Sequence, residues 1–254
     1  MKKLLLSARG LAVSVCRYAP GERHPPHTDR HSRISFLLRG GYREETSAAA
    51  IRMRPSDVLL KSSRARHEDV FGETGAILAA LEFIDDADPF DHLSGVPAWR
   101  RRADAFALRH ATAFLEAALA GDAESARAAG ADLLADTEDS ASRAKPPPWL
   151  DRLKCELEHA ALATVDVAAR ARAAGAHVAH ASRLFRRCYG ASITQHAQAQ
   201  SVRRALGQLA EPDQSLSDIA LAAGFYDQSH MNRVFRRITG RTPAACRALM
   251  AAAC

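Results

Sequence analysis

The stretch GFYDQSHMNRVFRRITGRTP, residues 224–243, combines a glycine turn, small polar residues and several arginines near the C-terminus. Asp227 is well suited to begin a helix, because its carboxylate can accept a hydrogen bond from a free backbone N–H of the first turn. A helix that begins there places Met231, Val234 and Phe235 on one side, as the helical period requires. The sequence therefore predicts an amphipathic helix after Asp227, with a polar face toward solvent.

The polar face of this helix has the chemistry of a DNA-reading surface. Glutamine can bind an adenine edge through two hydrogen bonds, and arginine can bind guanine in the same way. Arginines in the last turns suit phosphates, which position a protein on the duplex. An ordinary basic surface helix would carry arginines too, so their arrangement matters more than their presence. The candidate DNA-binding residues of this helix are Gln228, Ser229, His230, Asn232, Arg233, Arg236 and Arg237.

A weaker copy of the motif lies upstream. Gly175 of VDVAARARAAGAHVAHASRLFRRCYGAS corresponds to Gly224 of LSDIALAAGFYDQSHMNRVFRRITGRT, and each has an alanine four residues earlier. The alanine lets two helices approach closely, and the glycine can take the turn between them. Two copies 49 residues apart predict two helix-turn-helix units that could enter successive major-groove segments. The candidate DNA-binding residues of the first copy are Ala179, Ser182, Arg183, Arg186 and Arg187.

The spacing from SLSDIALAAGF through QSHMNRVFRRITGRTPAACR resembles the signature of the AraC/XylS family of transcriptional regulators. The resemblance covers residues 148–250 and implies a bipartite DNA-binding domain joined by a long helix, residues 193–210. The first copy departs from the family pattern, because Arg170 replaces an apolar residue, Ala181 replaces a leucine and Ala179 offers little hydrogen-bonding chemistry. Two interpretations of this copy stay open: a unit with mostly nonspecific DNA contacts, or a degenerate helix pair that supports the second unit.

The N-terminal part is predicted to form short β-strands up to about residue 85. LAVSVCRY, RISFLLRGGYREE, AIRMRPSDVLLKS and AILAALEFI are separated by Pro-Gly, Gly-Gly and other turn signals. Such spacing is typical of a small antiparallel barrel or sandwich. Residues 20–71 also resemble, less specifically, the cupin-like sensor domains that are often attached to this family.

Clustered histidines make a metal centre a hypothesis for this part. The cupin resemblance implies that His27, His31 and His67 converge inside a barrel as metal ligands. Imidazole suits Zn²⁺, Fe²⁺ and Ni²⁺, so a divalent metal is the one cofactor to consider. The HxH spacing of a metal cupin is absent, however, and surface histidines in a polar loop are the competing interpretation.

An alanine- and leucine-rich helical pattern begins after Pro97 and is expected to stop at Gly121-Asp122. The proline run at residues 146–148 marks the strongest boundary in the chain. The apolar residues between Pro97 and the proline run have two alternative interpretations. They form a homodimer interface, or they form a helical layer that covers the barrel of the same chain. These residues are Phe106, Leu108, Phe114, Leu115 and Leu119.

The expected fold class is α+β, in three parts. Residues 1–97 form a small cupin-like β-barrel that senses a signal, and residues 98–145 form a helical connector or dimerisation region. Residues 146–254 form an all-α domain with two helix-turn-helix units that bind DNA.

The net charge of +6 lies entirely after residue 147, because the preceding residues carry equal numbers of acidic and basic side chains. Such concentration favours an acidic-polymer partner such as DNA. The five cysteines show no metal-binding spacing and suit reduced thiols. Arg9 and Gly10 interrupt the N-terminal leucines, and no apolar run approaches the roughly 20 residues of a membrane span. A cytoplasmic protein without a membrane partner is expected.

These features predict a sequence-specific transcription regulator that binds double-stranded promoter DNA, is not an enzyme, and receives its input, such as a small-molecule effector, through the N-terminal domain. One alternative is a cupin-type metalloenzyme with an accessory DNA-binding domain, which requires a metal triad and an acid/base group. Another is a nonspecific nucleic-acid binder, whose affinity would collapse with salt.

Overall fold

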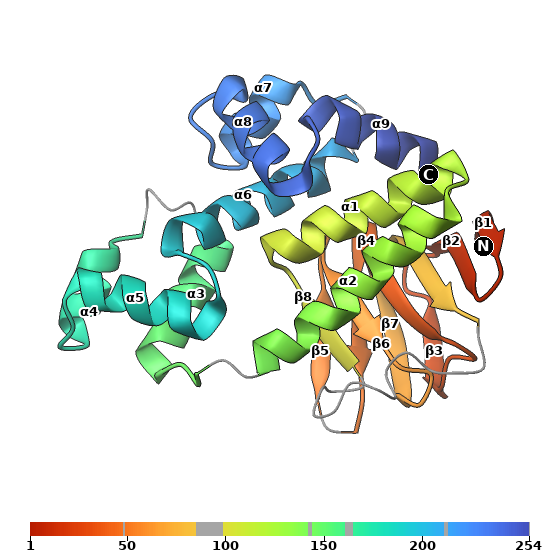
Figure 1. Cartoon of the computed structure of the whole chain (residues 1–254), viewed down its shortest axis with the longest axis horizontal. Helices are drawn as coiled ribbons and strands as arrows, with labels where there is room; N and C mark the ends of the chain where they lie inside the picture. The colour runs from red at the N-terminus through yellow and green to blue at the C-terminus, as the bar shows by residue number, and fades with distance from the viewer. Residues whose placement is uncertain (48, 85–98, 142–143, 161–164, 211–212, 254) are drawn as a thin grey trace.

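The computed structural model describes residues 1–47, 49–84, 99–141, 144–160, 165–210 and 213–253. Its strands are β1 (Lys2–Ala8), β2 (Leu11–Tyr18), β3 (Arg23–His27), β4 (Ser32–Glu45), β5 (Ala50–Met53), β6 (Val58–Lys61), β7 (His67–Phe83) and β8 (Trp99–Arg102). Its helices are α1 (Ala105–Ala120), α2 (Ala123–Ala141), α3 (Pro148–His159), α4 (Val167–Ala173), α5 (Val178–Tyr189), α6 (Ile193–Leu209), α7 (Leu216–Ala222), α8 (Gln228–Thr239) and α9 (Pro243–Ala253). The predicted α+β class, with strands first and helices after, is confirmed (Figure 1).

The described strands form one antiparallel sheet in the order β1-β2-β7-β4-β6-β8, with β3 paired to β7 and β5 paired to β4. The long strands β4 and β7 pair along most of their length and form the centre of the sheet. Their register shifts beside Gly40, and such irregularities bend a sheet. Gly40 has a φ of 76°, and a Cβ there would lie 2.0 Å from the carbonyl oxygen of Gly75. Only glycine permits this close approach.

The segment of residues 50–62 forms two strands, β5 and β6, and the turn signal Pro55-Ser56-Asp57 inside it marks the break between them. Between them Ser56 takes a left-handed φ of 71°. The Asp57 carboxylate accepts a hydrogen bond from the backbone N–H of Arg54 at 2.9 Å, which closes the turn. This β5–β6 turn lies against α6, where Asp57 contacts Arg203.

Alternate residues of the central strands face two different cores, as the period of a strand requires. On one face, Ile34 and Leu81 join a large apolar cluster with residues of α1 and α2. On the other face, Leu37, Leu59 and Leu78 form a second cluster within the bent sheet. The centre of the sheet is therefore buried on both sides, which explains its continuous apolar runs.

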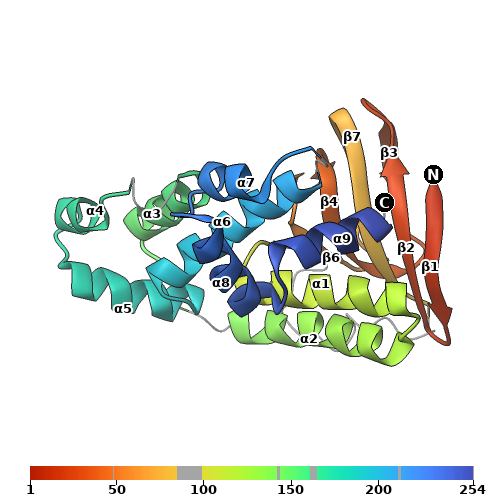
Figure 2. The ribbon, with the colours of Figure 1, turned by 90° about the horizontal axis from the view of Figure 1, so that it is seen from above.

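Helices α1 and α2 form the layer that packs on the first of these faces (Figure 2). Asp104 caps the start of α1, and Gly121 ends it with a φ of 76°, at the stop that the sequence predicts. The apolar residues considered for a dimer interface lie in or against the chain's own core: Phe106, Leu108, Phe114, Leu115 and Leu119. The structure thus explains them without a second protomer, and a homodimer stays a prediction.

Helices α3 to α9 make up the all-α part, and α6 connects its two helix-turn-helix units (Figure 1). A capping box of Ser192 and Gln195 begins α6 one residue before Ile193, so the predicted linking helix is confirmed. The two units belong to different cores. Leu153 and Phe185 of the first unit lie in a small cluster of α3, α5 and α6. Phe235 of the second unit lies in the large cluster with α1 and the sheet.

The predicted boundary between residues 97 and 98 lies outside the described residues. Within the described part of the chain, no helix has the length and apolarity needed to cross a membrane.

Candidate nucleic-acid interface and sensor cluster

Helix α8 begins where the sequence predicts. The Oδ1 atom of Asp227 accepts a hydrogen bond from the N–H of His230 at 2.6 Å, and this caps the first turn. Met231, Val234 and Phe235 are buried against the large core. The rotation of α8 is therefore fixed, and its polar face must point away from the molecule.

The predicted DNA-binding residues of α8 occupy that outer face. Arg233 and Arg236 are exposed, as are Ser229 and Arg237. Asn232 is half-buried beside them. Two arginines one turn apart on a solvent-facing helix can reach a base edge and a phosphate together.

Neighbouring residues hold the remaining candidates of α8 in place. The hydroxyl of Ser217 on α7 donates a hydrogen bond to Oε1 of Gln228 at 2.9 Å. The backbone N–H of Tyr226 donates to Nδ1 of His230 at 3.3 Å. Arg237 donates to the side chain of Gln198 on α6 at 2.6 Å, so this arginine is shared between the outer face and the linking helix. The outer face of α8 is thus ordered by its own unit.

Helix α5 of the first unit presents a similar face. It begins after His177, whose Nδ1 accepts from the N–H of Ala179 at 3.2 Å, and ends at Gly190. Ala181 and Phe185 are buried. All predicted candidates of this helix are exposed, namely Ala179, Ser182, Arg183, Arg186 and Arg187. The structure brings them together on one side of α5.

The departure at Arg170 has a structural explanation. Its guanidinium is exposed and pairs with Oε2 of Glu156 on α3 at 2.9 Å. Ala171, next to it, fills the buried position between the helices. The charge therefore lies outside the first unit's core.

Tyr226 is a candidate that the sequence reasoning missed. The first helices of the two units begin 49 residues apart, at Val167 and Leu216, whereas the second helices begin 50 apart, at Val178 and Gln228. The turn of the second unit is therefore one residue longer, and it places Tyr226, 86% exposed, beside the start of α8. This one-residue difference between the two copies is visible in the sequence and indicates the extra residue in the turn.

His180 is a second missed candidate. It is exposed on α5, at the position that corresponds to His230 of α8 when the two helices are aligned from their first residues. The equivalent histidines would have been visible from the alignment of the helix starts.

Several polar contacts hold the α-helical part on the N-terminal part, and two of them involve α8 and α6 directly. The guanidinium of Arg109 on α1 donates to the carbonyl oxygens of Arg237 and Ile238 at the end of α8, at 2.7 and 3.3 Å. At the other contact, Arg203 of α6 is buried and donates to Oδ1 of Asp57 in the β5–β6 turn. A mispositioned sensor domain would therefore displace both α6 and α8.

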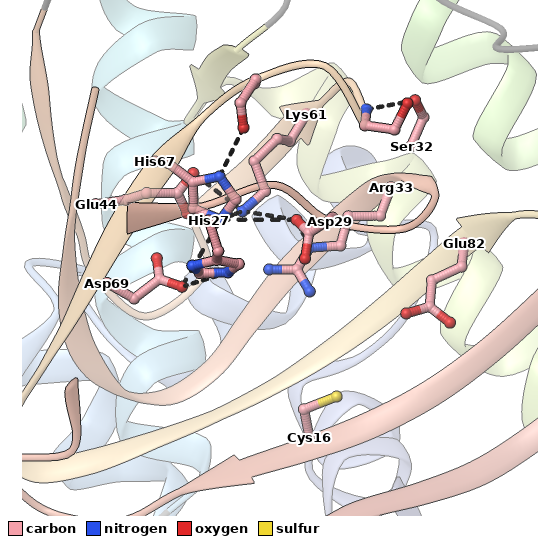
Figure 3. Close-up of polar contacts among 12 residues, drawn as sticks. Cys16, His27, Asp29, Ser32, Arg33, Glu44, Lys61, His67, Asp69 and Glu82 are labelled. Atoms are coloured by element: carbon pink, nitrogen blue, oxygen red, sulfur yellow. Dashed lines mark hydrogen bonds and ion pairs between the residues drawn. The ribbon is translucent and has the colours of Figure 1, made fainter. Parts of the chain in front are cut away.

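A buried polar cluster lies inside the sheet domain (Figure 3). Lys61 is fully buried, and its Nζ lies 2.6 Å from Nε2 of His67, 3.0 Å from Oδ2 of Asp29 and 3.1 Å from Oε1 of Glu44. The Nδ1 atom of His67 is 2.8 Å from the carbonyl oxygen of Ala65, which can only accept. His67 therefore carries its proton on Nδ1 and accepts from the Lys61 ammonium at Nε2.

Burial dominates the titration of this cluster. It lowers the pKa of Lys61, with the nearby Arg33 acting in the same direction. It also lowers the pKa of His67, helped by Lys61, so His67 is neutral beside the ammonium. Burial raises the pKa of Asp69 to about 6, and the neighbouring Glu44 adds to this. The cluster thus holds opposite charges in a dry site.

The predicted metal ligands are only partly brought together. His27 and His67 lie with their ring centroids 4.4 Å apart, and Asp29 completes a group whose ligand atoms lie within 4.8 Å of one another. Among the described residues, His31 belongs to no such group. Asp29 therefore takes the place that the sequence assigned to His31.

The arrangement does not fit a divalent metal. The Lys61 ammonium already occupies the position between His67 and Asp29, and it uses the Nε2 lone pair of His67 that a metal would need. Arg33, also buried, lies 3.3 Å from Asp29 and adds a second positive charge. A dication beside two buried cations is strongly disfavoured.

Comparison with known proteins bears on the C-terminal part. Residues 170–248 match a family model described as a helix-turn-helix domain. No curated protein sequence matches the chain. The assignment of residues 170–248 rests on the family match.

Several solved structures resemble the chain at low identity. ToxT from Vibrio cholerae O395 aligns with 96% of this chain and 99% of its own, at 10% identity and a TM-score of 0.39. The C-terminal domain of AraT, a response regulator from Geobacillus stearothermophilus, aligns with 41% of this chain and 88% of its own, at 17% identity and a TM-score of 0.37. KdgF from Halomonas sp. aligns with 33% of this chain and 77% of its own, at 20% identity and a TM-score of 0.31.

Proposed function

We propose that this chain is a DNA-binding transcription regulator similar to the AraC/XylS family, because residues 170–248 match a helix-turn-helix family model, and that α8 is its main sequence-reading element. The observation that carries the proposal is the outer face of α8. Its N-terminus is capped, its inner face is buried, and Arg233 and Arg236 are exposed beside the ordered Gln228. This is the geometry by which a recognition helix reads the major groove.

Gln228 and Arg233 are the residues that we assign to base edges. Ser217 occupies one lone pair of the Gln228 amide oxygen, and the second lone pair and the NH₂ group stay available for an adenine. Arg233 can bind a guanine with two parallel hydrogen bonds. Ser229, His230 and Asn232 are assigned to the same major groove of the DNA.

The first unit, together with the last turn of α8, is assigned to the DNA backbone. Arg183, Arg186 and Arg187 of α5 are exposed, and Ala179 beside them cannot read a base by hydrogen bonds. Ser182 also turns its hydroxyl back to the carbonyl oxygen of Val178, at 3.0 Å. The first unit therefore supplies mostly phosphate contacts, as do Arg236 and Arg237 of α8.

Selection of bound sequences from random DNA, at moderate salt, tests the reading of bases. The wild-type chain should enrich one motif, and Arg233→Ala and Gln228→Ala should each relax one position of it. Each lost bidentate contact is expected to cost about 1–3 kcal/mol of discrimination. Arg43→Ala is the matched control, since this exposed arginine lies on β4, pairs with Glu45 and should leave the motif unchanged.

Two results would contradict this assignment. An unenriched pool would show a nonspecific binder, and a motif unaffected by Arg233→Ala would place the reading element elsewhere. In contrast, Arg186→Ala should weaken binding to all sequences alike and reduce the slope of log affinity against log salt by about 1.

The sheet domain is proposed to receive the regulatory input. Contacts such as Arg109 with α8 and Asp57 with α6 would transmit a change in the sensor to the helices that bind DNA. Such coupling requires an input that binds the two states with different affinity. A small-molecule effector, a homodimer and a cytoplasmic location are parts of this proposal.

A further inference from the structure

A cavity of about 460 Å³ lies where the sensor part meets both helix-turn-helix units. Its walls come from the start of α1, the turn between α5 and α6, the first two turns of α6 and the end of α8. Small-molecule sites typically have volumes of about 300–1,000 Å³. The cavity is separate from the Lys61 cluster, and the residues that line it come from segments up to 136 positions apart, from Arg102 to Ile238.

The wall of this cavity is positively charged. Arg102, Arg109 and Arg237 line it, and Asp104 is the acidic residue among the described lining residues. Asp104 is already paired with Arg102, through hydrogen bonds of 3.0 and 2.9 Å. Arg109 and Arg237 therefore leave an excess of positive charge, and each uses only part of its five N–H donors in the contacts described above. An anionic group is the natural complement of this wall.

His196 contributes a neutral ring to the wall. It lines the cavity and is 8% exposed, and its Nε2 atom is buried without a hydrogen-bond partner within the described part of the chain. Burial and, next, Lys154 lower the pKa of His196 to about 4, so the ring adds no charge to the wall.

The rest of the lining is apolar. Phe106, Ala199 and Ile238 contribute hydrocarbon surface to the cavity. We infer that this cavity binds a small organic acid, whose carboxylate lies toward Arg109 and Arg237 and whose apolar body packs against Phe106.

Occupation of the cavity would link the two recognition helices. Tyr189 and Gly190 at the end of α5 and Arg237 at the end of α8 lie on its wall, so a bound acid fixes their relative position. This regulatory consequence rests on the proposed function, whereas the binding of the acid does not. The acid is therefore an effector of the DNA-binding part itself.

A matched library of small carboxylic acids and their primary amides tests the site. Ligand-observed NMR is carried out on the full chain, on Ala191→Trp and on Ala120→Trp. Ala191 lines the cavity, and a tryptophan there should fill it. Ala120 is exposed at the far end of α1, so the same substitution there controls for bulk and for added aromatic surface. Thermal unfolding of each variant verifies that it is folded.

The expected result is a set of acids that bind the wild-type chain and Ala120→Trp with similar affinity. Their affinity for Ala191→Trp should be at least tenfold lower. Each acid should also bind the wild-type chain at least tenfold more tightly than its amide does. Arg109→Gln should weaken the same acids. Acids that bind Ala191→Trp and the wild type equally, amides that bind as well as acids, or a library without binders would overturn the inference.

The result is independent of the DNA selection described above. Acids that bind in a chain without a selected DNA motif would leave the cavity as a ligand site and remove the proposed function. A selected motif in a chain without bound acids would do the reverse. If both succeed, repeating the DNA binding with the tightest acid measures the coupling directly.

Discussion

Lys61 occupies the position that a metal ion would need. Its replacement by alanine tests how much its buried ion pairs contribute to the free energy of unfolding. Lys61→Ala leaves the buried Glu44 without its ion-pair partner and leaves Asp29 paired with Arg33 alone. Such a loss is expected to lower the free energy of unfolding by about 3–5 kcal/mol. Urea denaturation measures this, with Lys2→Ala as the control, because the exposed Lys2–Glu82 pair should contribute about 1 kcal/mol or less. An unchanged stability in Lys61→Ala would contradict the geometry.

The same site makes a prediction about metals. The purified wild-type chain should contain no stoichiometric Zn²⁺, Fe²⁺ or Ni²⁺ and should gain no thermal stability from them. Lys61→Ala should gain stability from added Zn²⁺, because His27, Asp29 and His67 then face an unfilled position. Metal analysis and thermal unfolding check this. Stoichiometric metal in the wild type that disappears in His67→Ala would restore the sequence-based hypothesis.

His196 predicts how stability depends on pH. Its pKa is about 4 in the folded chain against an ordinary value of 6.5, so between these values the unfolded chain binds a proton that the folded chain does not. The stabilisation from His196 is complete above pH 6.5 and declines as the pH falls toward 4. Between pH 7 and pH 5, the wild type should lose roughly 2 kcal/mol more than His196→Gln in urea denaturation. Parallel pH profiles would mean that His196 is protonated in the folded state.

Single residues also show where the sequence stops being informative. Asp227, Met231 and Phe235 could be assigned because their roles depend on neighbours within one or two turns. Lys61 could not, because its partners come from separate segments around Asp29, Glu44 and His67 that only the folded sheet brings together. A lysine at the end of VLLK has the pattern of an ordinary exposed strand end.

At the level of the element, the start of α8 depends on one side chain. Asp227→Ala removes the acceptor for the N–H of His230 and should cost about 1 kcal/mol of stability. Asp227→Ser should retain most of the cap. Because Gln228 and Ser229 follow directly, Asp227→Ala should also weaken specific DNA binding more than Asp227→Ser does. Denaturation and DNA-binding titrations of both variants measure this, and equal behaviour of the two would show that the cap is dispensable.

The elements themselves were largely predictable, and the exceptions are instructive. A local signal predicts the end of α1 at Gly121, and the family resemblance implies the start of α6 at Ile193. The turn signal Pro55-Ser56-Asp57 within residues 50–62 is confirmed, although the left-handed φ of Ser56 is unusual for a residue other than glycine. The extra residue at Tyr226 was missed because the two glycines, not the two helix starts, were used to align the units.

At the level of the whole molecule, the two helix-turn-helix units should differ in stability. Phe235 of α8 shares a core with α1 and the sheet, whereas Phe185 of α5 lies in the small cluster with Leu153. Opening of α8 must therefore disrupt more buried apolar surface than opening of α5. Hydrogen exchange should show α8 amides protected to nearly the same free energy as α1 amides, and α5 amides less protected. Equal protection of α5 and α8 would contradict this difference.

This asymmetry could not be predicted from the sequence, because Arg109 and the end of α8 lie about 130 residues apart and no local pattern links them. The repeat predicts a weaker first unit, but it does not indicate that the second unit shares a core with α1 and the sheet. The proline run at residues 146–148 predicts a domain boundary, and the large core contains residues from both sides of it. Both follow from long-range packing of α1, which covers the sheet and α8 together.

The shared core of α1 and α8 has a consequence for how such a chain could be recombined. A chimera joined at the proline run would transplant the first unit as a complete module, since its apolar residues pack among α3, α5 and α6. The second unit would arrive with part of its interior missing, because the donor of α8 and α9 leaves behind the α1 surface and Arg109. A foreign sensor would therefore have to bring a compatible replacement for α1.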